Sequence, residues 1–416
     1  MSKIDFKFPE GFLWGSSTSS HQVEGGNKNQ WTVWEKKNAQ RLAQEAEANY
    51  SFSPVWSQIK GQAQNPQNYI SSEACRHWQL FEDDFNLLKE LNQNAYRFSL
   101  EWSRLEPEEG QFNQEALRHY QKMIDALSEK GIEPFITLWH WTLPVWLEEK
   151  DGLLAKDFEK YFEKFTEFVC SNLKGVKFWL TLNEPTVFIL NSYLKGIWPP
   201  QKKSLWQAKK AYTHLVAAHK NSYQKIHQLL PGTRVSLSHN ISDYEPVGFL
   251  DKITCFLLNK VSNEKILNDI RGCCDFLAVQ YYFHNRLKFF KIKNENEKIS
   301  DLGWEVYPKG LFHILKKLKK YNLPVYITEN GLADLNDKFR ADFISDHLFW
   351  VAQAMKEGVD VKGYFYWSLL DNFEWDKGFW PRFGLVEINY QTYQRKIRPS
   401  AFRYKKICQN NQLKKD

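Results

Sequence analysis

The 416-residue sequence has only six cysteines, and none of them lies in a C-x-x-C pair or in the close spacing of a disulfide-rich protein. No apolar run reaches the ~18 residues that a membrane span requires. Residues 1–10 contain neither the apolar core nor the cleavage site of a secretory signal. We therefore expect a cytoplasmic protein with reduced, mostly buried cysteines and no membrane partner.

Several motifs of catalysis and cofactor binding are also missing. The sequence contains no G-x-S-x-G, H-E-x-x-H, G-x-x-x-x-G-K-[ST] or G-x-G-x-x-G. Its histidines lack the clustered spacing of metal ligands, so we expect no metal and no other cofactor. The net charge of +7 is spread over the whole chain, which argues against a nucleic-acid partner.

Aromatic residues, by contrast, are abundant. They make up 16% of the chain, with 17 Trp, 19 Tyr and 30 Phe. Much of this must be core, because aromatic side chains bury large areas. The same side chains also suit a site that stacks on the apolar face of a sugar ring.

Eight short apolar runs predict strands that are buried on both faces of a parallel sheet, because most of them are continuous rather than alternating. The runs cover residues 12–16, 95–101, 134–139, 177–182, 234–238, 275–282, 324–328 and 361–369. Helical patterns lie between them over residues 114–130, 157–173, 205–230, 307–321 and 340–357. This order predicts an α/β protein, a single (β/α)8 TIM barrel over residues 1–416 with long βα loops over its C-terminal face.

Three further segments carry weaker patterns. Residues 27–73, rich in Gln and Asn, are expected to form a long loop after the first strand rather than a second domain. Residues 283–304 contain the basic stretch 286–293 and are expected to form a solvated loop. The polar tail 409–416 is expected to fray.

The active site of such a barrel forms at the carboxyl ends of its strands. The polar and aromatic residues expected there are Gln22, Arg97, His140, Asn183, Glu184, Gln280, Tyr282, Glu329, Trp367, Glu374 and Trp375. Glu184 and Glu329 follow strands on opposite sides of the barrel, so they can face each other across a small ligand. Two such carboxylates are what glycoside hydrolysis needs. Purely structural roles, such as core packing of His140 or Trp367, are the alternative.

The motifs around these residues resemble a known family. Asn183-Glu184-Pro185 in WLTLNEP and Glu329-Asn330-Gly331 in YITENG are similar to the two catalytic signatures of family 1 glycoside hydrolases, the β-glucosidase family. The similarity extends along nearly the whole chain. It includes FLWGSSTSSHQVEG (12–25), YRFSLEWSRLEP (96–107), TLWHWTLPVWL (137–147) and GYFYWSLLDNFEW (363–375).

The resemblance implies a catalytic role for each of five residues. Glu184 would be the acid/base and Glu329 the nucleophile, while Asn183 would bind the sugar 2-hydroxyl. Tyr282 and Arg97 would hold and polarise Glu329. A guanidinium beside Glu329 favours its ionised form, and the charge of Glu329 in turn raises the pKa of Glu184.

The resemblance also implies a set of substrate-binding residues. Gln22 and Glu374 would share the 4-hydroxyl, with Glu374 also reaching the 6-hydroxyl. His140 and Trp375 would contact the 3-hydroxyl, and the ring would stack on Trp367. The partner is thus expected to be a small β-glycoside or oligosaccharide.

The sequence departs from the family pattern at three places. Gln280 stands where the family usually has Asn, which changes contacts near the nucleophile or the 2-hydroxyl. Thr142 replaces a frequent Asp, and the segment 151–153 lacks the usual nearby Trp. We expect the last two differences to alter loop packing rather than chemistry.

These observations favour a retaining exo-β-glycosidase that acts on terminal β-D-glucosyl, and also β-D-galactosyl or fucosyl, residues through a covalent glycosyl-enzyme. A 6-phospho-β-glycosidase is one alternative, but Glu374 would repel a phosphate at the 6-position. A non-catalytic sugar-binding barrel is another, although such a protein would be expected to lack one of the two carboxylates. The aglycone, the choice between glucose and galactose, and the oligomeric state stay open.

Overall fold

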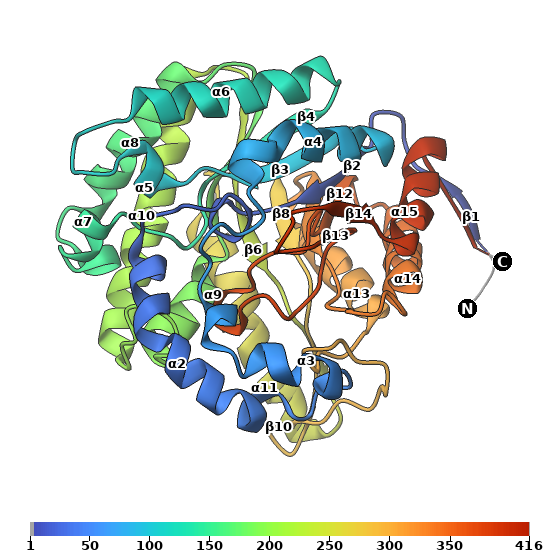
Figure 1. Ribbon diagram of the computed structural model, residues 1–416. Coiled ribbons are helices and arrows are strands. Elements are labelled where there is room, and N and C mark those ends of the chain that lie inside the picture. Colours follow the sequence, from blue (N-terminus) through green and yellow to red (C-terminus); the bar gives the residue numbers. More distant parts are fainter. Residues whose placement is uncertain (1–3, 416) are drawn as a thin grey trace.

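The computed structural model describes residues 4–415, and its centre is a closed barrel of eight parallel strands surrounded by helices (Figure 1). The strands are β2 (Leu13–Ser17), β3 (Ala95–Ser99), β4 (Glu133–Trp139), β5 (Phe178–Asn183), β6 (Arg234–Asn240), β8 (Leu277–Gln280), β11 (Val325–Asn330) and β12 (Val361–Trp367). Each predicted apolar run overlaps one of them, and the barrel closes through pairing of β12 with β2. The predicted (β/α)8 TIM barrel is confirmed.

The amino-terminal half of the barrel is filled by aromatic rings. Phe135 and Phe178 stack with ring centroids 4.1 Å apart, and Tyr326 and Phe365 pack around them. Gly15 lets Phe365 approach, because a Cβ there would lie 2.6 Å from its ring. This layer closes the barrel from below, so a ligand can enter only at the carboxyl ends of the strands.

The outer helices of the described chain comprise five that the sequence predicted, all ending close to the expected positions, and four others that it did not predict. They are α4 (His77–Glu90), α6 (Gln114–Glu129), α8 (Phe158–Asn172), α10 (Leu205–Leu229), α11 (Phe249–Leu258), α12 (Lys265–Asp269), α13 (Pro308–Leu318), α14 (Arg340–Lys356) and α15 (Pro399–Asn410). Shorter helices within the connections are α1 (Ser20–Val23), α5 (Trp102–Leu105), α7 (Val145–Glu148) and α9 (Pro185–Ile189). Gly131 and Gly358 follow α6 and α14 with φ of +69° and +82°, the left-handed conformation that ends a helix at little cost for glycine. None of the described helices has the length and hydropathy needed to cross a membrane.

The segment 27–73 corrects the expectation of a long loop. It contains the 21-residue helix α2 (Gln30–Tyr50) and the shorter helix α3 (Trp56–Ala63). Asn29 caps α2, because its side chain accepts from the Thr32 backbone while Thr32 Oγ1 accepts from the Asn29 backbone. The Gln- and Asn-rich composition concealed this cap and the buried apolar face of α2 behind it.

The segment 283–304 is also more ordered than a solvated loop. Its strands β9 (His284–Lys288) and β10 (Lys291–Ile292) form a hairpin that joins β7 (Asp243–Pro246) in a three-stranded sheet. Leu287 is buried in this sheet, whereas the turn of the hairpin is exposed. A second small sheet pairs β13 (Val386–Ile388) with β14 (Arg395–Ile397).

The tail does not fray within the described residues. Strand β15 (Gln412–Lys415) pairs antiparallel with β1 (Ile4–Lys7), and the Leu413 side chain between them is fully buried. The alternation of polar residues around one leucine is the pattern of a strand with a single inward side chain. All six cysteines are free and four of them are buried, as expected from their spacing.

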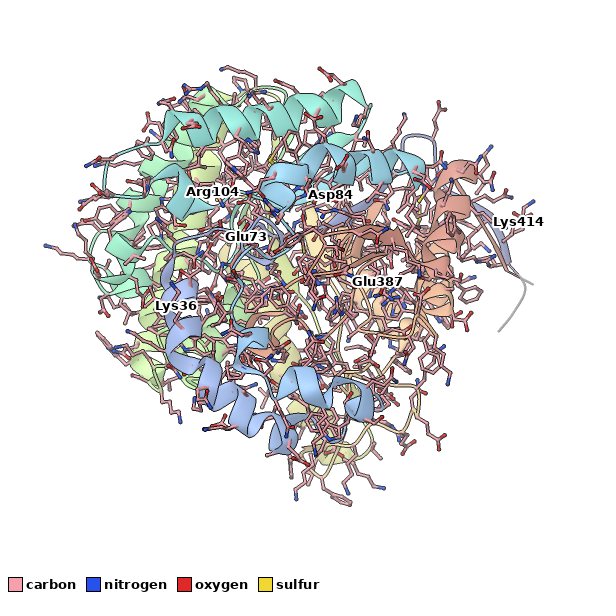
Figure 2. All side chains as sticks on the ribbon, in the orientation of Figure 1. Lys36, Glu73, Asp84, Arg104, Glu387 and Lys414 are labelled. Atoms are coloured by element: carbon pink, nitrogen blue, oxygen red, sulfur yellow. The ribbon has the colours of Figure 1, made fainter. Side chains whose placement is uncertain are left out.

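We predict that Leu413→Ala lowers the free energy of unfolding by about 2–4 kcal/mol, the usual cost of truncating a buried leucine. Lys414→Ala is the matched control, because Lys414 projects from the periphery of the molecule (Figure 2) and should change stability by about 0.5 kcal/mol or less. Urea denaturation measures both. Equal effects of the two substitutions would mean that the tail does not pack as described.

Candidate active site

Glu184 and Glu329 lie in one cavity of about 640 Å³ at the carboxyl ends of the strands, which a third carboxyl, Glu374, also lines. Glu329 belongs to β11, and Glu184 follows β5 at the point where the chain turns into α9. Glu184 has a φ of +40°, and Pro185 after it occupies the first position of α9. Both side chains are buried, with 4% of each residue exposed.

Glu329 is held on both of its oxygens. Arg97 Nη1 donates to Oε1, and the Tyr282 hydroxyl donates to Oε2 at 2.8 Å. Burial raises the pKa of Glu329, whereas the charge and hydrogen bond of Arg97 and the hydrogen bond of Tyr282 lower it. The two donors therefore favour the ionised carboxylate and offset part of the cost of its burial.

Glu184 has weaker support for a negative charge. Burial and the charge of Glu329 raise its pKa well above the ordinary value, against smaller lowering effects of Asn240 and Arg97. Its one hydrogen bond from a described side chain comes from Asn240 Nδ2, 2.9 Å from Oε1. Of the two carboxyls, Glu184 is thus the one that holds a proton more readily at neutral pH.

Asn183 is oriented by three neighbours. Its Oδ1 accepts from Arg97 Nη2 at 2.6 Å and from Gln280 Nε2 at 2.9 Å. Its Nδ2 therefore faces His140 Nε2 as a donor at 3.0 Å. Gln280, the departure from the family pattern, thus serves to position Asn183.

This network also fixes the state of His140. Burial and the charge of Arg97 lower the pKa of His140 well below its ordinary value, so the ring is neutral. Because Nε2 accepts from Asn183, the proton lies on Nδ1. Nδ1 is buried without a partner among the described residues, which leaves one donor for a ligand.

Gln22 and Glu374 meet at the other side of the cavity. Gln22 Nε2 lies 3.3 Å from Glu374 Oε2 and 2.9 Å from Asn372 Oδ1, while its Oε1 accepts from Ser19 at 2.7 Å. Burial raises the pKa of Glu374 to about 8, with Lys377 opposing and Asp376 adding to the shift. A neutral Glu374 can therefore donate as well as accept near neutral pH.

Aromatic rings form the walls between these polar groups. Trp367 and Trp375 are both nearly parallel to the His140 ring, with centroids 6.1 Å and 6.0 Å away. Trp141 and Trp198 pack on one another and on Trp375. Flat rings beside hydrogen-bonding groups suit a ligand with apolar faces and hydroxyl edges.

The structure brings the predicted site residues together. Of the eleven strand-end residues named from the sequence, nine line the cavity; Arg97 lies behind Glu329, and Gln280 lies behind Asn183. Sequence analysis missed Asn240, Trp141 and Trp198. Asn240 is the last residue of β6 and could have been found by the strand-end rule, but the predicted strand stopped two residues earlier. No group of side chains suited to a metal occurs among residues 4–415.

A (β/α)8 barrel with two buried carboxylates at the carboxyl ends of its strands defines a glycoside hydrolase. The family model for glycosyl hydrolase family 1 matches residues 4–254 and 258–413, and the chain belongs to this family. The resemblance noted in the sequence is thereby confirmed.

Similar proteins agree with this assignment. Beta-glucosidase A of Thermotoga maritima is 32% identical over 98% of this chain and 99% of its own length. A β-glycosidase structure from Pyrococcus horikoshii is 38% identical with a TM-score of 0.86, and the match covers 99% of this chain and 97% of that one. The Thermotoga maritima β-glucosidase in complex with glucoimidazole is 30% identical with a TM-score of 0.84, over 97% and 99% of the two chains. The chain is therefore an enzyme of the β-glucosidase type.

We predict that Glu374→Gln removes a pH-dependent loss of stability. The pKa of Glu374 is raised from 4.5 to about 8, so between these values the folded protein holds a proton that the unfolded chain releases. Stability is lost as the pH rises through this window, because a buried carboxyl must then ionise. Gln cannot ionise, so relative to wild type the variant should gain about 4 kcal/mol between about pH 5 and about pH 9, since one pKa unit corresponds to about 1.4 kcal/mol.

Denaturant unfolding of both proteins at the two pH values measures this difference. The exposed Glu297 provides the control, since Glu297→Gln should follow the wild-type dependence. A Glu374→Gln profile that is parallel to wild type would show that Glu374 is ionised in the folded protein throughout.

Proposed function

We propose that this enzyme is a retaining exo-β-glycosidase that releases terminal β-D-glucosyl residues, and also β-D-galactosyl and β-D-fucosyl residues, through a covalent glycosyl-enzyme. The unequal surroundings of the two carboxylates carry this proposal. Glu329 has a cation and a hydroxyl donor, whereas Glu184 has one amide donor and a raised pKa. Such a difference separates a nucleophile from an acid.

In the first step, Glu329 attacks the anomeric carbon while Glu184 gives its proton to the glycosidic oxygen, and the bond to the aglycone breaks. Ester formation removes the charge of Glu329, which is one cause of the raised pKa of Glu184. The pKa of Glu184 then falls, so Glu184 stays ionised and is available to accept a proton. In the second step it takes a proton from a water molecule that attacks the anomeric carbon and releases Glu329.

The remaining polar groups would select the sugar. The neutral His140 offers Nδ1–H to the 3-hydroxyl beside Trp375, and Asn183 bonds to the 2-hydroxyl. Gln22 and Glu374 lie close enough to share the 4-hydroxyl, and the ring stacks on Trp367. The glucoimidazole complex of the related Thermotoga maritima β-glucosidase supports a glucose-like ligand.

The two alternatives have less support. Lys377, the cavity lysine beside Glu374, is paired with Asp376 at 2.7 Å, so its charge is already largely compensated and is poorly placed to bind a phosphate at the 6-position. A non-catalytic barrel has no need of two differently held carboxyls in one cavity.

We predict that Glu329→Ala abolishes turnover of every nitrophenyl glycoside, because the covalent step has lost its nucleophile. Added azide should restore some activity with inverted configuration. Glu184→Ala should still be glycosylated by dinitrophenyl glucoside, whose leaving group needs no proton, and azide should accelerate its second step with retention. Proton NMR of the azide products measures the configuration. Retained product from Glu329→Ala and inverted product from Glu184→Ala would reverse the assigned roles.

We also predict that Asn240→Ala raises the alkaline limit of kcat/KM by about one pH unit. Asn240 donates to the carboxylate form of Glu184 and so lowers its pKa. Loss of a hydrogen bond to a charged group costs about 1.5 kcal/mol, which corresponds to about one unit. Asn191→Ala is the control, because Asn191 lines the same cavity without bonding to Glu184. An unchanged limit in Asn240→Ala would mean that Glu184 is not the group that titrates.

A further inference from the structure

Helix α11 (Phe249–Leu258) is built with its apolar side outward. Its buried residues are Asp251 and Cys255, whereas Phe249 is 76% and Phe256 60% exposed. Leu250, Ile253 and Leu257 are exposed as well. A helix of a globular protein normally turns its apolar stripe toward the core. The exposed apolar side chains of α11 are therefore suited to burial against an apolar surface outside this chain's own core.

The turn of the β9–β10 hairpin extends this surface. Phe289, Phe290 and Ile292 are all exposed there, and the Phe290 backbone N–H donates to Asp251 Oδ1 of α11 at 3.1 Å. Figure 1 places α11 and β10 together at one end of the molecule. Eleven of the nineteen large hydrophobic side chains that are exposed among residues 4–415 lie within 247–261 and 289–292. We call these two segments the apolar face.

Unpaired lysines border the apolar face. Lys252 lies on α11, and Lys288, Lys291 and Lys293 surround the turn of the hairpin. All four are exposed, and none of them forms a salt bridge with a residue that the structure describes. An exposed apolar helix with lysines at its border is the composition that binds at the interface of an anionic bilayer.

The apolar face is continuous with the mouth of the active-site cavity. Val261, at the end of the face, is 67% exposed and lines the cavity in the π-helical turn η4 (Asn259–Glu264). Leu190 and Leu194 of η3 (Leu190–Leu194) also line the cavity and are exposed. Exposed apolar side chains thus continue from the outer surface to the lining of the cavity that holds the two carboxylates.

We propose that the apolar face docks on an anionic lipid surface, so that the cavity receives glycosides whose aglycone is a long alkyl chain. A second copy of the chain is the weaker occupant, because a symmetric contact would place the same unpaired lysines opposite one another. A lipid surface accepts the apolar side chains and pairs the lysines with headgroup phosphates. Docking is an interfacial contact rather than a membrane span, so the proposal departs from the expectation of no membrane partner, which rested on the lack of a long apolar run. The substrate part of this inference rests on the proposed function, whereas the docking part does not.

Flotation with vesicles tests docking without any substrate. The wild-type protein should float with vesicles of phosphatidylcholine and phosphatidylglycerol, and much less with phosphatidylcholine alone. Phe256→Asp combined with Phe289→Asp should lower the partition coefficient at least about tenfold, because two charges would enter the apolar layer. Lys288→Glu combined with Lys291→Glu should lower it by a similar factor or more on anionic vesicles only, since each lysine contributes about fivefold.

Phe402→Asp is the matched control. Phe402 is an exposed phenylalanine of α15, which Figure 1 shows on a different side of the molecule from α11, so its variant should float like wild type. Turnover of nitrophenyl glucoside should be unchanged in all variants, which shows that they are folded. Wild type that stays in solution with both kinds of vesicle would overturn the proposal. So would a wild-type dimer that Phe256→Asp converts to a monomer in light scattering.

The substrate part is tested by the ratio of kcat/KM for octyl and methyl β-glucoside. We expect the wild-type ratio to exceed about ten, because each buried methylene group of the octyl chain contributes up to about 0.8 kcal/mol of binding free energy. Leu190→Ser combined with Leu194→Ser should lower this ratio at least about threefold. A ratio near one would remove the alkyl aglycone from the proposal. Failure of the proposed function would look different, because neither glucoside would then be turned over while flotation would still occur.

Discussion

The buried guanidinium of Arg97 is the interaction on which the active site depends. It lies on β3 with none of its surface exposed, and it donates to Glu329 through one nitrogen and to Asn183 through another. Its Nε donates to Thr137 on β4, which ties the cation to a second barrel strand. A buried carboxylate without such a partner would protonate rather than stay charged. The same side chain thus favours the ionised form of the proposed nucleophile and orients the amide that would bind the 2-hydroxyl.

The barrel offsets the free-energy cost of burying these charged and polar groups, because several of its strands supply hydrogen-bond donors at once. Asn183 lies in β5, Gln280 in β8 and Glu329 in β11, so each of these residues is held by a barrel strand rather than by a loop. The aromatic layer below them excludes water from the floor of the cavity. In that setting the charge of one carboxyl strongly affects the other, which is why the pKa of Glu184 depends on Glu329.

The barrel and most of the site could be predicted from the sequence because both depend on local patterns. Continuous apolar runs mark strands buried on both faces, and polar residues just after them mark the open end of the barrel. The segments whose structure was predicted wrongly depend instead on partners that are distant in the sequence. Leu413 gives no strand signal without β1 to pair with, and the Gln-rich α2 is recognisable only once its cap at Asn29 and its buried tryptophans are seen. Asn240 was missed because a strand boundary moved by two residues.

The outward-facing apolar residues of α11 illustrate a further limit of pattern analysis. The spacing of Phe249, Ile253 and Phe256 is that of an amphipathic helix, and periodicity alone would assign these side chains to the core. Burial shows the reverse, since the core side of α11 carries Asp251, whose carboxylate accepts from the Gly248 and Phe290 backbones. A carboxylate used as a local cap fixes which side of the helix faces the protein. The phenylalanines are consequently left at the surface, on the segment whose last residue, Val261, lines the cavity of Glu184 and Glu329.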